Sequence, residues 1–280
     1  MWTRSRRRDE ARYPRLVTTG TPLLAESIVG DSGPTVVFCH GLFGRGRNFG
    51  AIAGALQPDY RCVLLDMPNH GSSPWTDDFD YETAASMLVD HLRAGVAADG
   101  PVHLVGHSMG GKICMTAALM APDLVDHLVV VDIAPTSSEA TTEFVHLMDV
   151  MLSLDLDSAH TRRDVDAQMA AEVPQSGLRG FLLQNLRHEG DHFAWQPNLA
   201  MLRRDIDAVI GEIPFLGREF EGRTLWVAGS ESGYVTPEAT HVMRGSFPHV
   251  RKVVIKGSGH WVHSEKPREF TAVLRAFLDA

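Results

Sequence analysis

Short apolar runs alternate with helix-like segments along most of the chain, and this alternation limits the possible folds more than any other feature. The runs contain four to six residues, are rich in β-branched side chains and do not alternate strictly in polarity: TVVFC (35–39), CVLLD (62–66), VHLVG (102–106), HLVVVD (127–132), TLWVA (224–228) and KVVI (252–255). Such runs are typical of strands covered on both faces. Helical patterns occupy about 81–97, 109–120, 236–245 and 266–279. The alternation predicts an α/β fold with a mostly parallel, doubly wound sheet.

One stretch, from about Pro135 to Arg218, interrupts this alternation. It contains helix-like segments such as TEFVHLMDVMLSL and RGFLLQNL but no convincing strand. Its apolar faces are too few for a separate core, so we predict a helical cap at 135–218, inserted into one α/β domain formed by 1–134 and 219–280. Ahead of the first parallel strand, LVTTGTPLLAESIVG predicts an antiparallel edge hairpin around a glycine turn.

Composition excludes several classes of protein. With 44% apolar and 22% charged residues the chain can bury a sizeable core, and its formal charge of −9 argues against nucleic acid as a partner. Because no apolar run approaches about 20 residues, stable membrane insertion is not expected. The basic N-terminal run lacks the apolar segment of a secretory signal. Cys39, Cys62 and Cys114 form no disulfide framework. We therefore expect buried thiols and a cytoplasmic location.

The segment LVGHSMGGK carries the strongest chemical signal in the sequence. Gly106 to Gly110 fit G-x-S-x-G, with an apolar strand before them and a helix after them. A side chain at either glycine would clash in so sharp a turn, which holds Ser108 in a strained conformation and lifts its hydroxyl above the sheet. The N–H of Met109 then points into the same space. The sequence therefore predicts Ser108 as a nucleophile and Met109 as one donor to an oxyanion.

The second oxyanion donor and the general base are expected in two other loops. FCHGLFGRGRNF follows the first parallel strand, where the backbone turn predicts that the N–H of Leu42 joins that of Met109. We interpret His40 in this loop as a structural turn residue. GSGHWVHSEKP follows the last strand and leaves His260 on a tight loop as the predicted base. His263, at the start of a helix, is the rival and is expected to cap or pack there.

Taken together, HGLFG, DMPNHGSSP, GHSMGGK, VVVDIAP, FLLQNL and GHWVHSEKP resemble the α/β-hydrolase superfamily over nearly the whole chain, and within it the small YbfF-type esterase branch. The resemblance implies hydrolysis of carboxylic esters or acyl thioesters, a helical cap over the site and no cofactor. It also implies a serine–acid–histidine triad, whose acid in much of the superfamily follows the strand equivalent to TLWVA and in some members an earlier strand.

The acid is the uncertain member of this triad. Ser232 occupies the usual position, and a serine cannot hold a negative charge against an imidazolium. Asp132 lies at the carboxyl end of an adjacent strand, where open α/β sheets gather their sites, and it preserves the order serine, acid, histidine. We predict Asp132 as the acid. Glu231 and a cap carboxylate such as Asp205 or Asp207 are the alternatives.

Other motifs carry weaker signals. Asp66 and His70 in DMPNHGSSP are interpreted as a structural turn in which Asp66 holds backbone N–H groups. Several cap side chains could line an acyl pocket or simply pack within the cap: Met148, Met151, Leu152, Phe193 and Trp195. No cluster has metal-ligand spacing, and the glycine-rich loop before Asn48 lacks the ending of a phosphate-binding loop, so no metal and no cofactor are expected.

These features predict a serine hydrolase, either a carboxylesterase or an acyl-thioesterase, acting through an acyl-enzyme on small esters with short to medium acyl groups. Two alternatives share the fold. The first is a carbon–carbon bond hydrolase or cofactor-free perhydrolase with the same triad. The second is a non-catalytic ligand-binding protein.

Overall fold

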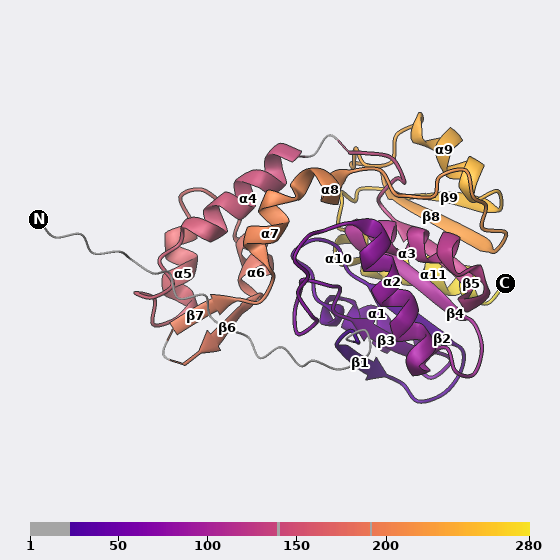
Figure 1. Ribbon diagram of the computed structural model, residues 1–280, viewed down its shortest axis with the longest axis horizontal. Helices are drawn as coiled ribbons and strands as arrows, with labels where there is room; N and C mark the ends of the chain where they lie inside the picture. Colours follow the sequence, from indigo (N-terminus) through magenta and orange to yellow (C-terminus); the bar gives the residue numbers. More distant parts are fainter. Residues whose placement is uncertain (1–22, 139–140, 191) are drawn as a thin grey trace, which may run out of the picture.

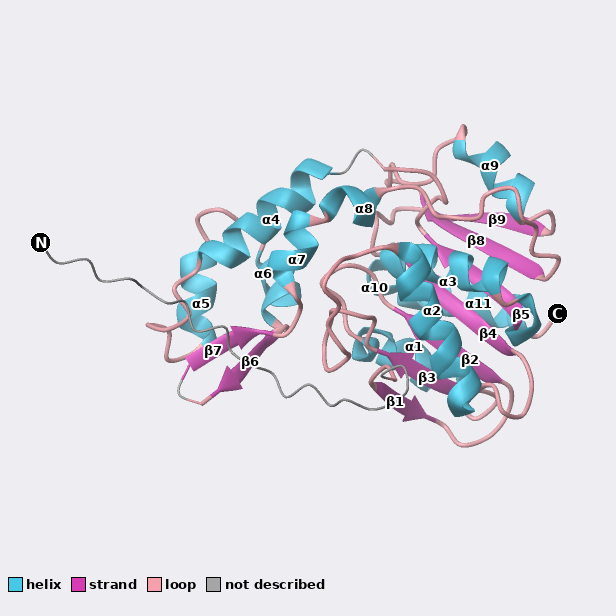
Figure 2. Cartoon of the chain, viewed as in Figure 1, coloured by secondary structure: helices cyan, strands magenta, loops and turns pink. Residues whose placement is uncertain are grey.

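A seven-stranded sheet forms the centre of the molecule, seen in a computed structural model that describes residues 23–138, 141–190 and 192–280 (Figures 1 and 2). The strand order is β1-β3-β2-β4-β5-β8-β9. The strands are β1 (Glu26–Val29), β2 (Thr35–Cys39), β3 (Arg61–Leu65), β4 (Val102–His107), β5 (Val125–Val131), β8 (Arg223–Gly229) and β9 (Val250–Ile255). Only β1 pairs antiparallel to its neighbour. The predicted α/β fold with a mostly parallel sheet is therefore confirmed.

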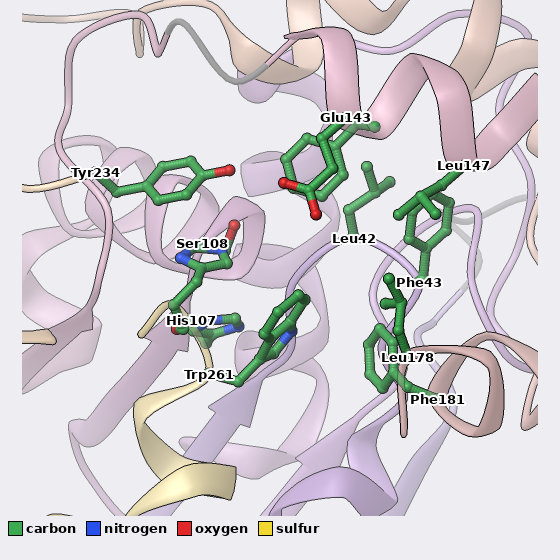
Figure 3. A pocket seen from close by; sticks show the side chains of 12 residues that line it. Leu42, Phe43, His107, Ser108, Glu143, Leu147, Leu178, Phe181, Tyr234 and Trp261 are labelled. Atoms are coloured by element: carbon green, nitrogen blue, oxygen red, sulfur yellow. Dashed lines mark hydrogen bonds between the residues drawn. The ribbon is translucent and has the colours of Figure 1, made fainter. Parts of the chain in front are cut away.

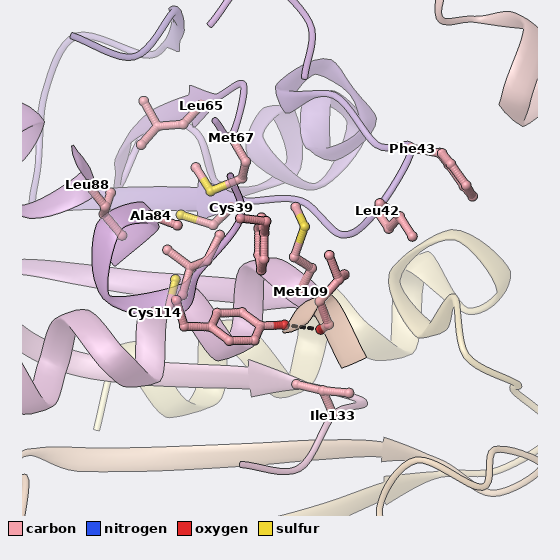
Figure 4. Close-up of a cluster of buried hydrophobic side chains, with 14 of the residues drawn as sticks. Cys39, Leu42, Phe43, Leu65, Met67, Ala84, Leu88, Met109, Cys114 and Ile133 are labelled. Atoms are coloured by element: carbon pink, nitrogen blue, oxygen red, sulfur yellow. Dashed lines mark hydrogen bonds between the residues drawn. The ribbon is translucent and has the colours of Figure 1, made fainter. Parts of the chain in front are cut away.

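Helices cover both faces of the sheet because successive strand residues point to opposite sides. In β2, Val37 and Cys39 join one apolar cluster, while Val36 and Phe38 join the other. The first cluster is covered by α2 (Tyr81–His91), α3 (Met109–Met120) and α9 (Ala239–Ser246), and the second by α1 (Gly50–Leu56) and α11 (Pro267–Leu278). Figure 4 shows part of the first cluster reaching the loop residue Leu42. The loops that form the site therefore rest on a packed core.

The segment between β5 and β8 forms a cap beside the carboxyl ends of the strands (Figure 1). Its helices are α4 (Thr141–Ser153), α5 (Arg162–Met169), α6 (Ser176–Leu183), α7 (Leu199–Arg204) and α8 (Ile206–Ile210). The expectation of a purely helical cap is wrong, because β6 (Leu186–Glu189) and β7 (His192–Trp195) pair as an antiparallel hairpin. Their sequences, LRHE and HFAW, mix polar and apolar residues, so neither forms an apolar run that would show in the sequence.

Lys112, on α3, joins both ends of the cap to the core. Its side chain is buried, and Nζ donates hydrogen bonds to the carbonyls of Thr136 at 2.9 Å and Ile210 at 3.0 Å, and also to that of Gly211. Burial lowers the pKa of this amine to about 7, partly opposed by the charge of Glu212. The segments that begin and end the cap are therefore fixed to the helix that follows the predicted nucleophile.

The predicted N-terminal edge hairpin falls only partly within the described residues. Its second arm is β1, which pairs with β3 at the edge of the sheet, whereas its first arm and the basic run lie outside the described residues. Among the helices that the structure describes, none is long and apolar enough to cross a membrane.

Candidate active site

Ser108 lies on the sharp turn between β4 and α3, with backbone angles φ 52° and ψ −123°. A positive φ is rare for a residue with a side chain and marks local strain. The turn is possible only because its flanking residues are glycines. A Cβ on Gly106 would lie 2.4 Å from the carbonyl oxygen of Gly110, and one on Gly110 would lie 2.3 Å from that of Cys39. The structure thus has the predicted turn, with Ser108 at the carboxyl end of the central strand.

The loop after β2 passes directly against Ser108. A Cβ on Gly41 would lie 3.0 Å from the Cβ of Ser108 and 2.9 Å from Nδ1 of His107, so only glycine permits this approach. Leu42 and Met109, the two predicted oxyanion donors, line one small cavity together with Ser108. The structure therefore brings the two predicted donor residues to the nucleophile.

Two buried histidines hold this loop in place. Nε2 of His40 accepts a hydrogen bond from the N–H of Met67 at 2.9 Å, and Nε2 of His70 accepts one from the N–H of Phe43 at 3.2 Å. Burial lowers the pKa of His40 to about 3 and that of His70 to about 4, so both imidazoles are neutral acceptors at neutral pH. His40 is a structural residue of the loop, in agreement with its interpretation from the sequence.

His260 lies in the loop between β9 and α10 (Val262–Glu265) and lines the same cavity as Ser108. The carboxylate of Glu265 accepts the N–H groups on both sides of it, from Gly259 at 2.7 Å and from Trp261 at 3.2 Å. The backbone carbonyl of His260 accepts a hydrogen bond from Nε2 of His107 at 2.9 Å. The backbone of His260 is therefore held on three sides.

His263, the rival base, packs inside the core. It is buried, stacks on the ring of Phe49 with centroids 4.6 Å apart, and burial lowers its pKa to about 3. It is therefore a packing residue, as expected from its place at the start of a helix.

Asp132 is the carboxylate that meets His260. Its side chain is fully buried, and Oδ2 lies 2.8 Å from Nδ1 of His260. Oδ1 accepts the N–H of Gly229 at 2.8 Å, and Oδ2 also accepts the hydroxyl of Ser232. A buried carboxylate needs such donors, because desolvation without them is costly. Asp132 has φ 50°, a conformation that aspartate tolerates better than most residues.

The three alternative acids lie elsewhere. Glu231 is exposed, and its N–H donates to the carbonyl of Ser258. Asp205 accepts hydrogen bonds from the N–H of Phe79 and from the guanidinium of Arg204, and Asp207 is exposed on α8. The structure does not bring any of them to His260.

Two residues next to Asp132 and His260 were not predicted from the sequence. Ser232, considered in the sequence only as an unsuitable acid, donates its hydroxyl to the carboxylate of Asp132. Tyr234 stacks on the imidazole of His260 with ring centroids 4.0 Å apart and an angle of 24°. Both come from the turn after β8, next to the end of β5 in the sheet. They could have been found only from the pairing of β8 with β5, which the sequence does not show directly.

The cavity above Ser108 has a volume of about 60 Å³ and lies between the core loops and the cap (Figure 3). Its wall includes Leu42, Phe43, Phe144, Leu147, Leu178, Phe181, Trp261 and Glu143. A neighbouring groove of about 310 Å³ shares Leu178, Phe181 and Trp261 with it. The apolar cap residues singled out in the sequence pack within the cap instead, except that Leu152 is exposed.

Asp66 has the structural role predicted for it. Its two oxygens accept the N–H groups of Gly46 and Ser72, each at 2.9 Å. It therefore joins the turn after β3 to the loop after β2, as a buttress for the loop that carries Leu42.

Within the described part of the chain, one group of metal-ligand side chains lies at the opposite end of the sheet. His103, Asp126 and His127 have donor atoms within 4.8 Å of one another, at the beginnings of β4 and β5. The sequence did not indicate this group, because its residues come from two different strands. The guanidinium of Arg223 lies 3.0 Å from Nε2 of His127. This positive charge disfavours a cation there.

Comparison with known proteins agrees with this geometry. Residues 36–273 match the family described as Alpha/beta hydrolase family. The mouse sn-1-specific diacylglycerol lipase ABHD11 is 36% identical over 265 residues, which cover 92% of this chain and 85% of that protein. Esterase YbfF of Escherichia coli K12 is 32% identical over 87% of this chain and 92% of its own. A solved marine microorganism esterase has a TM-score of 0.88 at 30% identity, covering 91% of this chain and 99% of that one.

With the fold, the turn that carries Ser108 and these relatives in agreement, the chain belongs to the alpha/beta hydrolase family and is an ester hydrolase of the esterase and lipase type.

Proposed function

We propose that the protein is a serine carboxylesterase that cleaves its substrate through an acyl-enzyme on Ser108. The observation that carries this proposal is the 2.8 Å contact between Asp132 Oδ2 and Nδ1 of His260, in a loop that lines the cavity of Ser108. A carboxylate can only accept at that contact, so Nδ1 carries the hydrogen and Nε2 is free to take the proton of the Ser108 hydroxyl.

The first half of the reaction follows from this arrangement. Ser108 Oγ attacks the ester carbonyl while His260 takes its proton, and Asp132 stabilises the resulting imidazolium. The N–H groups of Leu42 and Met109 stabilise the oxyanion, at about 3 kcal/mol per donor. Met109 is also the first residue of a 12-residue helix, whose positive end favours negative charge there.

The second half repeats these steps with water. His260 gives its proton to the departing alcohol oxygen, and the acyl group remains on Ser108. His260 then deprotonates a water that attacks the acyl carbonyl, and the acid product leaves as Ser108 recovers its hydrogen. Ser108, His260 and Leu42 line one cavity, and Met109 lines the adjoining one together with Ser108 and Leu42.

The space around Ser108 supports acyl groups of short to medium length. The cavity over Ser108, at about 60 Å³, is much smaller than the neighbouring groove of about 310 Å³. A longer acyl chain must therefore continue into the neighbouring groove of about 310 Å³, past Leu178 and Phe181. Short-chain esters are the proposed substrates. Glycerides are included in the proposal because a related protein carries the name of a diacylglycerol lipase.

The proposed location is the cytoplasm, and the thiols support it. Cys39, Cys62 and Cys114 are free and buried, and burial raises the pKa of Cys62 to about 11. Buried neutral thiols are unreactive, and free thiols are typical of proteins in a reducing compartment.

The proposal is tested with p-nitrophenyl butyrate and a fluorophosphonate probe. The protein should turn over the ester and be labelled by the probe, whereas Ser108→Ala should lose at least about 10⁴-fold in rate and all labelling. Ser32→Ala, at an exposed serine away from the cavity, is the matched control and should behave as the unaltered protein. Labelling or turnover that survives Ser108→Ala would overturn the proposal.

A further inference from the structure

The cavity above Ser108 has two chemically different sides. Apolar side chains from the core loop and the cap line one side, where Phe43, Leu147 and Phe181 lie together (Figure 3). On the other side the carboxylate of Glu143 and the hydroxyl of Tyr234 point toward the space over Ser108. An ester also has two different parts, an acyl group and an alcohol, so the two sides can distinguish them.

Glu143 has no basic partner within the described ranges. It lies in the first turn of α4, is exposed at the cavity, and takes part in none of the ion pairs found between described side chains. Burial raises the pKa of the Tyr234 phenol, and the negative charges of Glu143 and Asp132 raise it further. Glu143 therefore offers an uncompensated acceptor to whatever enters the cavity.

The chemistry of the reaction decides which part of the ester meets these groups. His260 must deliver a proton to the oxygen of the leaving alcohol, so the alcohol lies on the side of the imidazole. Tyr234 stacks on that imidazole, and Glu143 faces Tyr234 across the cavity. The alcohol portion therefore extends toward the polar side and the acyl group toward the apolar side.

We propose that Glu143 and Tyr234 bind the alcohol portion of the ester and select a neutral alcohol that bears a free hydroxyl. A hydroxyl can donate to the carboxylate of Glu143, which makes a charge-assisted hydrogen bond. An anionic alcohol portion, such as one with a carboxylate or phosphates, is repelled by the same charge. This inference rests on the proposed esterase function and names its substrate class.

The test uses three esters with the same acyl group and alcohols of nearly equal size: propyl butyrate, 2-hydroxyethyl butyrate and butyryloxyacetate. Beyond the first carbon of the alcohol, they carry an ethyl group, a hydroxymethyl group and a carboxylate. Acid release is followed in a pH-stat at pH 7.5, and kcat/KM is compared as a ratio to propyl butyrate. Such ratios cancel any general loss of activity in a variant.

In the unaltered protein the hydroxyl ester should be preferred over propyl butyrate, and the carboxylate ester should be the poorest substrate. Glu143→Gln should lower the hydroxyl ratio about tenfold and raise the carboxylate ratio about fivefold, and Glu143→Lys should make the carboxylate ester the best of the three. Glu172→Gln removes the same charge from an exposed cap position outside the cavity and should leave all three rates unchanged.

Equal effects of Glu143→Gln on all three esters would overturn the inference, as would the same ratios in Glu172→Gln. Hydrolysis of none of the three by the unaltered protein, together with no labelling of Ser108, would instead show that the proposed function is wrong, and the inference would fall with it.

Discussion

The carboxyl ends of β5 and β8 lie side by side in the sheet, yet they contribute to the site in different ways. β5 is followed by Asp132, a fully buried carboxylate that contacts His260. β8 ends at Gly229, and the turn after it carries Ser232; both of these donate hydrogen bonds to the Asp132 carboxylate. One strand end supplies the charge and the other supplies the donors that hold it.

This difference shows what the reaction requires of the sheet. The imidazole needs one buried carboxylate at Nδ1, and two neighbouring strand ends can reach the same point. In this chain the end of β5 carries the carboxylate, and the turn after β8 reaches it through Gly229 and Ser232.

The largest expected effect comes from removing the charge at the end of β5. Asp132→Asn should lower kcat for p-nitrophenyl butyrate by about 10⁴-fold, because the amide can donate to Nδ1 and so favours the wrong tautomer of His260. Far-ultraviolet circular dichroism and a thermal melt should show that the variant is folded. A loss of only a few fold would make Asp132 a structural residue.

Moving the acid back to the end of β8 is the sharpest test of the comparison. Asp132→Asn combined with Ser232→Asp should recover about 10- to 100-fold of the lost rate, because position 232 already places its side chain against the acid. Asp132→Asn with Ser230→Asp, two residues earlier and exposed, is the matched control and should recover nothing. No recovery in either would mean that only the end of β5 can position the charge.

A smaller effect is expected from the hydroxyl that holds the acid. Ser232→Ala should lower kcat about tenfold with KM little changed, since the carboxylate loses one donor and orients His260 less well. Glu231→Gln, at the exposed neighbour, should change kcat by less than about twofold. Steady-state kinetics on p-nitrophenyl butyrate distinguish the two, and equal effects would argue against a specific role for Ser232.

The sequence predicted those parts of the site that depend on local geometry. The turn around Ser108 is defined by five consecutive residues, Gly106 to Gly110, and the loop of His260 follows a recognisable strand. The position of Asp132 required only that β5 be adjacent to β4, which follows from one strand–helix–strand unit.

The parts that were missed depend on contacts between distant segments. The hydroxyl of Ser232 meets Asp132 across 100 residues, after the whole cap has intervened. Glu143 and Tyr234 come from the cap and from the turn after β8, and nothing in either local pattern indicates that they share a cavity. The hairpin of β6 and β7 was missed because its short strands, LRHE and HFAW, mix polar and apolar residues and pair only with each other.

The contacts of Lys112 have a consequence for how this architecture can diversify. The amino group of Lys112 donates hydrogen bonds to carbonyls at both the beginning and the end of the cap, and so holds the two junctions together. Lengthening a chain segment whose two ends are held together adds little entropic cost. Cap segments of different length can therefore be inserted between these two junctions. The α/β core would then stay the same, and different substrate ranges would arise from different cap segments between β5 and β8.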